Sequence, residues 1–169
     1  TGPCYRRAQI FADAMSGKLK QKEVITKITE KRNQEYVRAL GLLPLSRRNP
    51  QGDILKRYRL LQRFLKESKQ FGAQRQASEK IAVKIALDNL ARTANYPDPI
   101  RLSWAMEALE AQEILEKSKP FVDKEIAISL QIDALGKAHL IVTKADKELK
   151  AIPSKLRKHK AVLQLKEHQ

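Results

Sequence analysis

The stretch Asn95–Ala108, NYPDPIRLSWAMEA, decides how the helices of this chain follow one another. A residue that precedes proline is disfavoured in the helical region, so a helix must end near Tyr96 and Asp98. Asp98 can then cap a new helix that has Pro99 at its first position. Together with Pro97, these residues predict a rigid structural corner between two helices rather than a ligand-binding loop.

Apolar side chains recur at helical spacing after this corner. One face of the helix would carry Ile100, Trp104, Ala108, Ala111 and Leu115, and this face would be widened by Leu102, Met106 and Leu109. We expect this helix to fold back antiparallel on the preceding one. Trp104, the only tryptophan, would be a bulky wedge in the core.

Several helices are also predicted before the corner. Residues 73–95 carry a wide apolar face, and a preceding helix begins after Asp53, which is a credible N-cap. Two shorter helices are expected before residue 45, and Gly41 can end the second of them in a left-handed cap. The polar link 46–52 then joins them to the helix that follows Asp53.

The periodicity changes after Pro120 from helical spacing to alternation. Residues 126–132 and 138–144 alternate as strands do, with turns at 134–137 and 145–148. A short third strand at 149–153 and a final helix capped by Ser154 would follow. The fold class is therefore mainly α (α+β): a helical bundle or helical-hairpin stack, then a small antiparallel β-hairpin or meander and a C-terminal helix. We expect a helical domain over 1–120 and a hairpin with its closing helix over 121–169, packed together as one unit.

Composition restricts the compartment and the class of partner. The 169 residues carry a formal net charge of +15, and 42% of them are hydrophobic. No apolar run is long enough to span a bilayer and no signal peptide is visible, so we expect a cytoplasmic protein. The single cysteine, Cys4, favours a reducing compartment. Because the first residue is Thr1, a fragment of a longer protein is expected.

A row of basic side chains is the clearest candidate for a binding site. Positions opposite the apolar stripe of the helix after Asp53 carry Lys56, Arg59, Arg63 and Lys66, and Arg47 and Arg48 precede them. Such a row can bind phosphates without regard to sequence. It can equally bind an acidic protein or remain solvated. Exposed aromatic side chains that would stack on the bases of a single strand are missing from this row.

Motifs for catalysis are absent from the sequence. Neither common glycine-rich phosphate loop occurs, and no histidine spacing matches a zinc site. Glu107, Glu110, Glu113 and Glu116 could in principle serve acid–base or metal chemistry, but a solvated helix face is the simpler interpretation. We therefore assign no catalytic residue, metal or cofactor, and whether the parent protein is an enzyme stays open.

Three stretches together resemble a known family. They are EYVRALGLLPL (35–45), RLLQRFLKESKQFGAQRQASEKIAVKIALDNLARTANYPDPIRLSWAMEA (59–108) and KELKAIPSKLRKHKAVLQLKE (147–167). They resemble a segment of large, uncharacterised, mostly bacterial proteins built around a domain of unknown function. Some members carry a WGR module, and some are labelled molybdate-metabolism regulators. The resemblance covers most of 34–167 and implies a longer intracellular parent, but it supplies no catalytic residue.

The function expected from these observations is a non-catalytic scaffold or interaction module within a larger intracellular protein, with a basic face for an acidic partner. A nucleic-acid-binding module that uses the basic helix face at 47–69 is the alternative. A fragment of an enzyme whose active site lies elsewhere in the parent is the second alternative. A further partner of the interaction module would be the remainder of the parent chain, and we expect no membrane to be involved.

Overall fold

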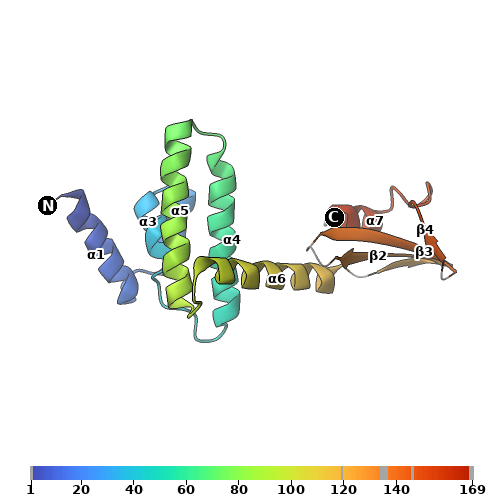
Figure 1. Cartoon of the computed structure of the whole chain (residues 1–169), viewed down its shortest axis with the longest axis horizontal. Coiled ribbons are helices and arrows are strands. Elements are labelled where there is room, and N and C mark those ends of the chain that lie inside the picture. Colours follow the sequence, from blue (N-terminus) through green and yellow to red (C-terminus); the bar gives the residue numbers. More distant parts are fainter. Residues whose placement is uncertain (1, 119, 134–136, 146, 168–169) are drawn as a thin grey trace. The chain divides into compact units, whose positions relative to one another are not determined.

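The computed structural model describes residues 2–118, 120–133, 137–145 and 147–167. Two compact units divide the chain, Thr1–Met106 and Glu107–Gln169 (Figure 1). The division falls inside a helix, α6 (Pro99–Lys117). The domains expected over 1–120 and 121–169 stay a prediction. The expected packing of residues 121–169 on the helical part stays a prediction.

The first unit is built from helices. They are α1 (Pro3–Met15), α2 (Gln21–Thr29), α3 (Gln34–Leu40), α4 (Pro50–Ser68), α5 (Ala73–Thr93) and the first turns of α6. The long helices α4 and α5 form an antiparallel hairpin, and α3 packs against α5, α2 and α1 (Figure 1). The core is aliphatic, with Leu40, Leu61 and Leu90 among its fully buried side chains. The mainly helical prediction for this part is confirmed.

Helix α4 begins earlier than its sequence suggested. Asn49 is the N-cap, since its side-chain oxygen accepts a hydrogen bond of 2.9 Å from the amide of Gly52, and Pro50 occupies the first position. The prediction of Asp53 as the N-cap is therefore wrong. Asp53 lies in the first turn and is buried, because its carboxylate is used by side chains from elsewhere in the unit.

Gly41 follows α3 with a φ of −68°, so the predicted left-handed cap is also wrong. Its missing side chain serves packing instead. A Cβ placed at Gly41 would lie 2.5 Å from both the carbonyl oxygen of Ala86 and the amide nitrogen of Leu90. Thr93 Oγ1 donates a 2.6 Å hydrogen bond to the Gly41 carbonyl oxygen. The glycine thus allows the end of α3 to approach the backbone of α5.

The corner between α5 and α6 forms as its prolines predict. Asn95 takes a φ of 59° after α5, and the Asp98 carboxylate accepts a 2.8 Å hydrogen bond from the amide of Arg101. Asp98 also pairs with the Arg101 guanidinium. Hydrogen bonding to the amide and guanidinium of Arg101 outweighs a smaller effect of burial and lowers the pKa of Asp98.

The predicted packing of α6 is wrong. In the first turns of α6, which belong to the first unit, Trp104 is 65% exposed instead of being a core wedge. Ile100 is exposed as well, whereas Leu102 and Met106 on another face are fully buried. The helix is apolar on both faces, so hydrophobic periodicity alone could not decide which of them is buried.

The second unit contains a four-stranded antiparallel meander in the order β1-β2-β3-β4. Its strands are β1 (Phe121–Asp123), β2 (Ile126–Ile132), β3 (Ala138–Lys144) and β4 (Lys147–Leu149), and α7 (Lys160–Glu167) closes the unit. The core between sheet and helix includes Ile128, Val142 and Val162. The central hairpin and closing helix are confirmed. The fold is therefore α+β.

The edges of this unit differ from prediction. Strand β1 was not predicted, and β4 begins within the expected turn at 145–148. Helix α7 begins at Lys160 instead of after Ser154, because residues 154–158 form turns. Residues 134–136 of the expected turn at 134–137, and residue 146, lie outside the described residues.

Candidate functional site

A buried ion pair fixes the loop that carries the first basic residues. Arg57 is only 1% exposed, and its guanidinium donates to the carbonyl oxygens of Leu40 (3.2 Å), Leu43 (2.6 Å) and Pro44 (2.8 Å). It also donates from Nε and Nη2 to both carboxylate oxygens of Asp53, at 3.1 and 2.9 Å. These bonds use all five donors of the guanidinium, so the chain after α3 is held against α4.

Asp53 completes the anchor of this loop. Its carboxylate also accepts from the Ser46 amide (2.9 Å) and from Gln21 Nε2 (2.6 Å). Burial by itself would raise the pKa of Asp53, but the hydrogen bonds from Ser46, Arg57 and Gln21 outweigh it and lower the pKa. The carboxylate is therefore ionised at neutral pH, and Arg47 and Arg48 extend from a loop with a fixed start.

A second ionic cluster joins the turn after α2 to α4 and α5. Arg32, at a φ of 45°, donates to Glu79 at 3.1 and 2.7 Å, to Glu67 at 2.9 Å and to the Phe64 carbonyl oxygen at 2.9 Å. Its guanidinium carbon also lies 4.0 Å from the centroid of the Phe64 ring. Arg75 donates to Glu79 at 3.0 Å from the other side.

The Glu79 side chain is fully buried in this cluster. Burial would raise its pKa, but hydrogen bonding, with Arg32 the strongest donor, lowers the pKa to about 2. Sequence reasoning missed the pair because Arg32 and Glu79 are separated by 47 residues with no common pattern. The Asp53–Arg57 pair could have been found, since it has the i,i+4 spacing of a helical ion pair among apolar neighbours.

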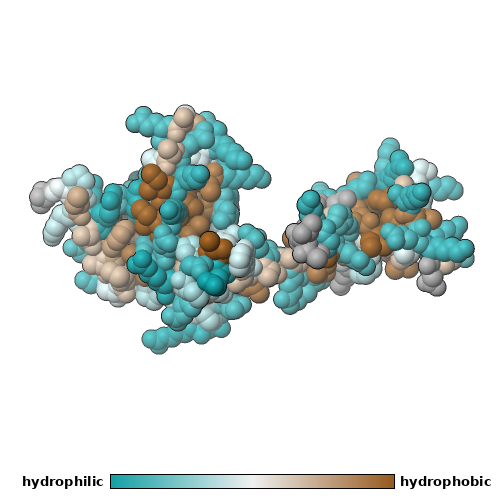
Figure 2. All heavy atoms as spheres, viewed as in Figure 1, coloured by the Kyte–Doolittle hydropathy of each residue, from teal (hydrophilic) through white to brown (hydrophobic). Residues whose placement is uncertain are grey.

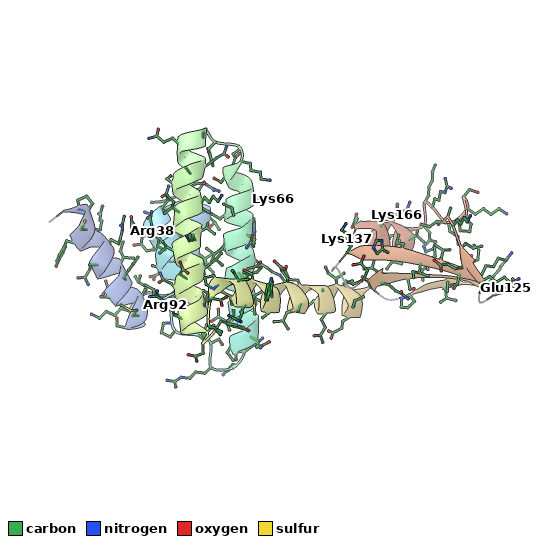
Figure 3. The ribbon with its side chains drawn as sticks, in the orientation of Figure 1. Arg38, Lys66, Arg92, Glu125, Lys137 and Lys166 are labelled. Carbon is green, nitrogen blue, oxygen red and sulfur yellow. The ribbon has the colours of Figure 1, made fainter. Side chains whose placement is uncertain are left out.

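Five exposed cations on and before α4 take no part in these internal ion pairs. We call them the basic face: Arg47, Arg48, Lys56, Arg63 and Lys66. Within the residues that the structure describes, none of the five makes an ion pair. Lys66, labelled in Figure 3, lies on the outer side of α4, where Figure 2 shows a hydrophilic surface.

Not every basic residue of this region belongs to the basic face. Arg57 and Arg75, which lie within the same stretch of sequence, are engaged by Asp53 and Glu79. Arg59 is half-buried and has an interaction partner of its own, so it is not part of the basic face. The structure therefore separates arginines that are paired inside the fold from cations that are exposed and make no ion pair among the described residues.

Other candidate chemistry is limited. Glu107, Glu110, Glu113 and Glu116 follow one another along α6, and no group of three or more histidine, cysteine, aspartate or glutamate residues among those described could hold a metal ion. No helix of the described chain is long and apolar enough to cross a membrane.

The described surface of the first unit includes two grooves between helices. One, of about 660 Å³, lies between α1 and α3, and the other, of about 290 Å³, lies between α4 and α5.

Comparison with curated proteins and with solved structures finds no match. Residues 1–106, however, match a family of unknown function (DUF5724). The matched residues coincide with the first compact unit, Thr1–Met106, so the family corresponds to this helical unit. The chain belongs to the family of unknown function DUF5724.

Proposed function

We propose that the helical unit is a non-catalytic interaction module of a larger cytoplasmic protein, and that its basic face binds an acidic partner. The observation that carries the proposal is that the basic side chains around α4 fall into two groups, one paired inside the fold and one exposed. Arg32, Arg57 and Arg75 are bound by carboxylates inside the fold, whereas the five cations of the basic face have no ion-pair partner among the described residues. Unpaired cations on a helix and on the loop before it favour association with a polyanion and speed its encounter.

An acidic protein surface and a nucleic acid would both be attracted. A nucleic acid is the second candidate because Lys56 to Lys66 span ten residues of helix, about 15 Å, which is a few phosphate spacings. The basic face carries no aromatic side chain, so its contact with a nucleic acid would be with the backbone and insensitive to sequence. Preference for duplex over acidic peptide is the outcome that would select this second candidate.

The resemblance of residues 34–167 to large bacterial proteins supports a longer parent of that kind. In this proposal the parent is related to the proteins labelled molybdate-metabolism regulators, some of which carry a WGR module. The helical unit then supplies binding, and any chemistry resides in other parts of the parent. A catalytic motif found in the parent sequence outside this segment would favour the enzyme-fragment alternative.

Charge reversal tests the proposal. The variant Arg47→Glu/Arg63→Glu should weaken binding of a fluorescein-labelled poly-glutamate peptide, or of a duplex oligonucleotide, by at least about tenfold. The matched control Lys80→Glu/Lys84→Glu makes the same change in net charge on exposed positions of α5. Fluorescence anisotropy measures the affinity of each variant. An equal loss of affinity in both variants would show a response to net charge alone and would overturn the assignment of the basic face.

A further inference from the structure

The groove between α1 and α3 is a second site that the basic face does not explain. It has a volume of about 660 Å³ and is lined on the α1 side by Tyr5, Arg6, Gln9 and Ile10, and on the α3 side by Glu35 and Tyr36. Tyr5 is 64% exposed, so its ring is presented to solvent instead of contributing to the core. Tyrosine rings within one groove offer flat apolar surfaces on which another planar ring can stack.

Among the described residues that line the groove, the one carboxylate, Glu35, is paired with two guanidinium groups. Glu35 accepts from Arg7 Nε at 2.7 Å and Nη2 at 2.8 Å, and from Arg38 Nη1 at 2.9 Å. The hydrogen bonds from Arg7 lower the pKa of Glu35, against a smaller opposing effect of partial burial. Glu35 is therefore ionised but already shared by two guanidinium groups, and it repels an incoming anion only weakly.

Arg6 gives the groove an available positive charge. It lies on α1 beside Tyr5, it is exposed, and it makes no ion pair within the described part of the chain. Counting Arg6, Arg7 and Arg38 against Glu35, the groove and its rim carry a net charge of +2. Aromatic rings beside a free guanidinium are the combination that single-stranded nucleic-acid binders use, with the ring stacking on a base and the cation on the backbone.

We propose that this groove binds an unstacked base of a single-stranded nucleic acid, with Tyr5 and Tyr36 contacting the base and Arg6 the adjacent phosphate. The site could not be predicted from the sequence, because Tyr5 and Tyr36 are far apart in the chain and neither belongs to the basic face. The inference depends on the groove's own residues and does not require the basic face. A duplex hides its bases in the stack, so the groove should prefer single strands.

The test compares a fluorescein-labelled oligothymidine with a duplex oligonucleotide by anisotropy, using the whole chain. The wild type should bind the single strand more tightly than the duplex. Tyr5→Leu/Tyr36→Leu should weaken single-strand binding by about tenfold or more and leave duplex binding unchanged. Tyr5→Phe/Tyr36→Phe, which keeps both rings, should bind like the wild type.

Further variants separate this inference from the proposed function and from misfolding. Tyr5→Leu alone changes an exposed side chain and should still weaken single-strand binding. Arg47→Glu/Arg63→Glu should not abolish the preference for single strands, even where it weakens all binding.

Equal binding of single strand and duplex by the wild type, no binding of the single strand, or unchanged binding by a folded Tyr5→Leu/Tyr36→Leu variant would each overturn the inference.

Discussion

Arg57 and Asp53 lie one turn apart on α4 and share two hydrogen bonds inside the fold, where both residues are buried. The pair does more than join two side chains. Its remaining contacts reach the carbonyl oxygens of Leu40, Leu43 and Pro44, so that one guanidinium determines how the chain passes from α3 into the loop before α4. The loop presents Arg47 and Arg48 to solvent because its start is fixed in this way.

Removing Arg57 tests this anchor. Arg57→Met leaves the Asp53 carboxylate buried without its cation, and should lower the free energy of unfolding by about 3–5 kcal/mol. Arg63→Met, at an exposed position of the same helix, should change it by no more than about 0.5 kcal/mol. Urea unfolding followed by circular dichroism measures both. A loss below about 1 kcal/mol for Arg57→Met would contradict the structural role of the pair.

Glu79 should make the free energy of unfolding depend on pH in the acidic range. Its pKa falls from an ordinary value of 4.5 to about 2 in the folded protein, so its contribution is complete above the unfolded pKa and is lost as pH falls from about 4.5 to about 2. This shift corresponds to about 3 kcal/mol. Unfolding free energies measured across this range should fall more steeply for the wild type than for Glu79→Gln. Parallel pH profiles of the two proteins would refute the linkage, and Glu30→Gln serves as an exposed control.

Gly41 should tolerate no side chain. Gly41→Ala places a Cβ against the backbone of α5 at Ala86 and Leu90, and should destabilise the protein by about 1–3 kcal/mol because two helices must separate. Gly72→Ala is the matched change, since a Cβ there meets nothing within 4 Å. Thermal unfolding of the two variants checks this. Equal melting temperatures would mean that α3 and α5 are not in the close contact described.

Trp104 should be dispensable for stability. Because it is 65% exposed, Trp104→Ala should change the free energy of unfolding by less than about 1 kcal/mol. Leu102→Ala on the buried face of the same helix should lower it by about 2–5 kcal/mol. Iodide should also quench the fluorescence of this single tryptophan efficiently in the folded protein. A large loss of stability for Trp104→Ala would restore the core-wedge interpretation.

Local sequence signals predicted the parts of the fold that depend on neighbouring residues. Alternation identified β2 and β3, and the prolines around Asp98 identified the corner before α6. Features that depend on tertiary packing could not be predicted from these local signals. Ile100 and Trp104 share one apolar face of α6 while Leu102 and Met106 share another, and only the surrounding helices decide which face is buried. Gly41 appeared to be a helix cap because the close approach of α5 is invisible in sequence.

The candidate site also combines features that the sequence predicts with features that only tertiary packing decides. The row of cations on α4 was predicted from helical spacing, but spacing could not separate Arg57 from its neighbours, because only its buried partners remove it from the surface. The tyrosines of the α1–α3 groove lie on helices that meet through tertiary packing. Charge patterns thus suggested a kind of partner, and the structure decides which charges are available to it.

The salt dependence of binding to the basic face tests the account most directly. Dissociation constants for the duplex oligonucleotide and the poly-glutamate peptide would be measured across a salt series, for the wild type and for Arg47→Glu/Arg63→Glu. We expect affinity of the wild type to fall linearly on logarithmic axes, with a slope of about −4.5 for duplex if all five cations contact phosphates, and with clearly weaker binding and a shallower slope for the variant. No binding of either polyanion at low salt, or the same slope and affinity for both proteins, would contradict the central claim that these five cations form the binding face.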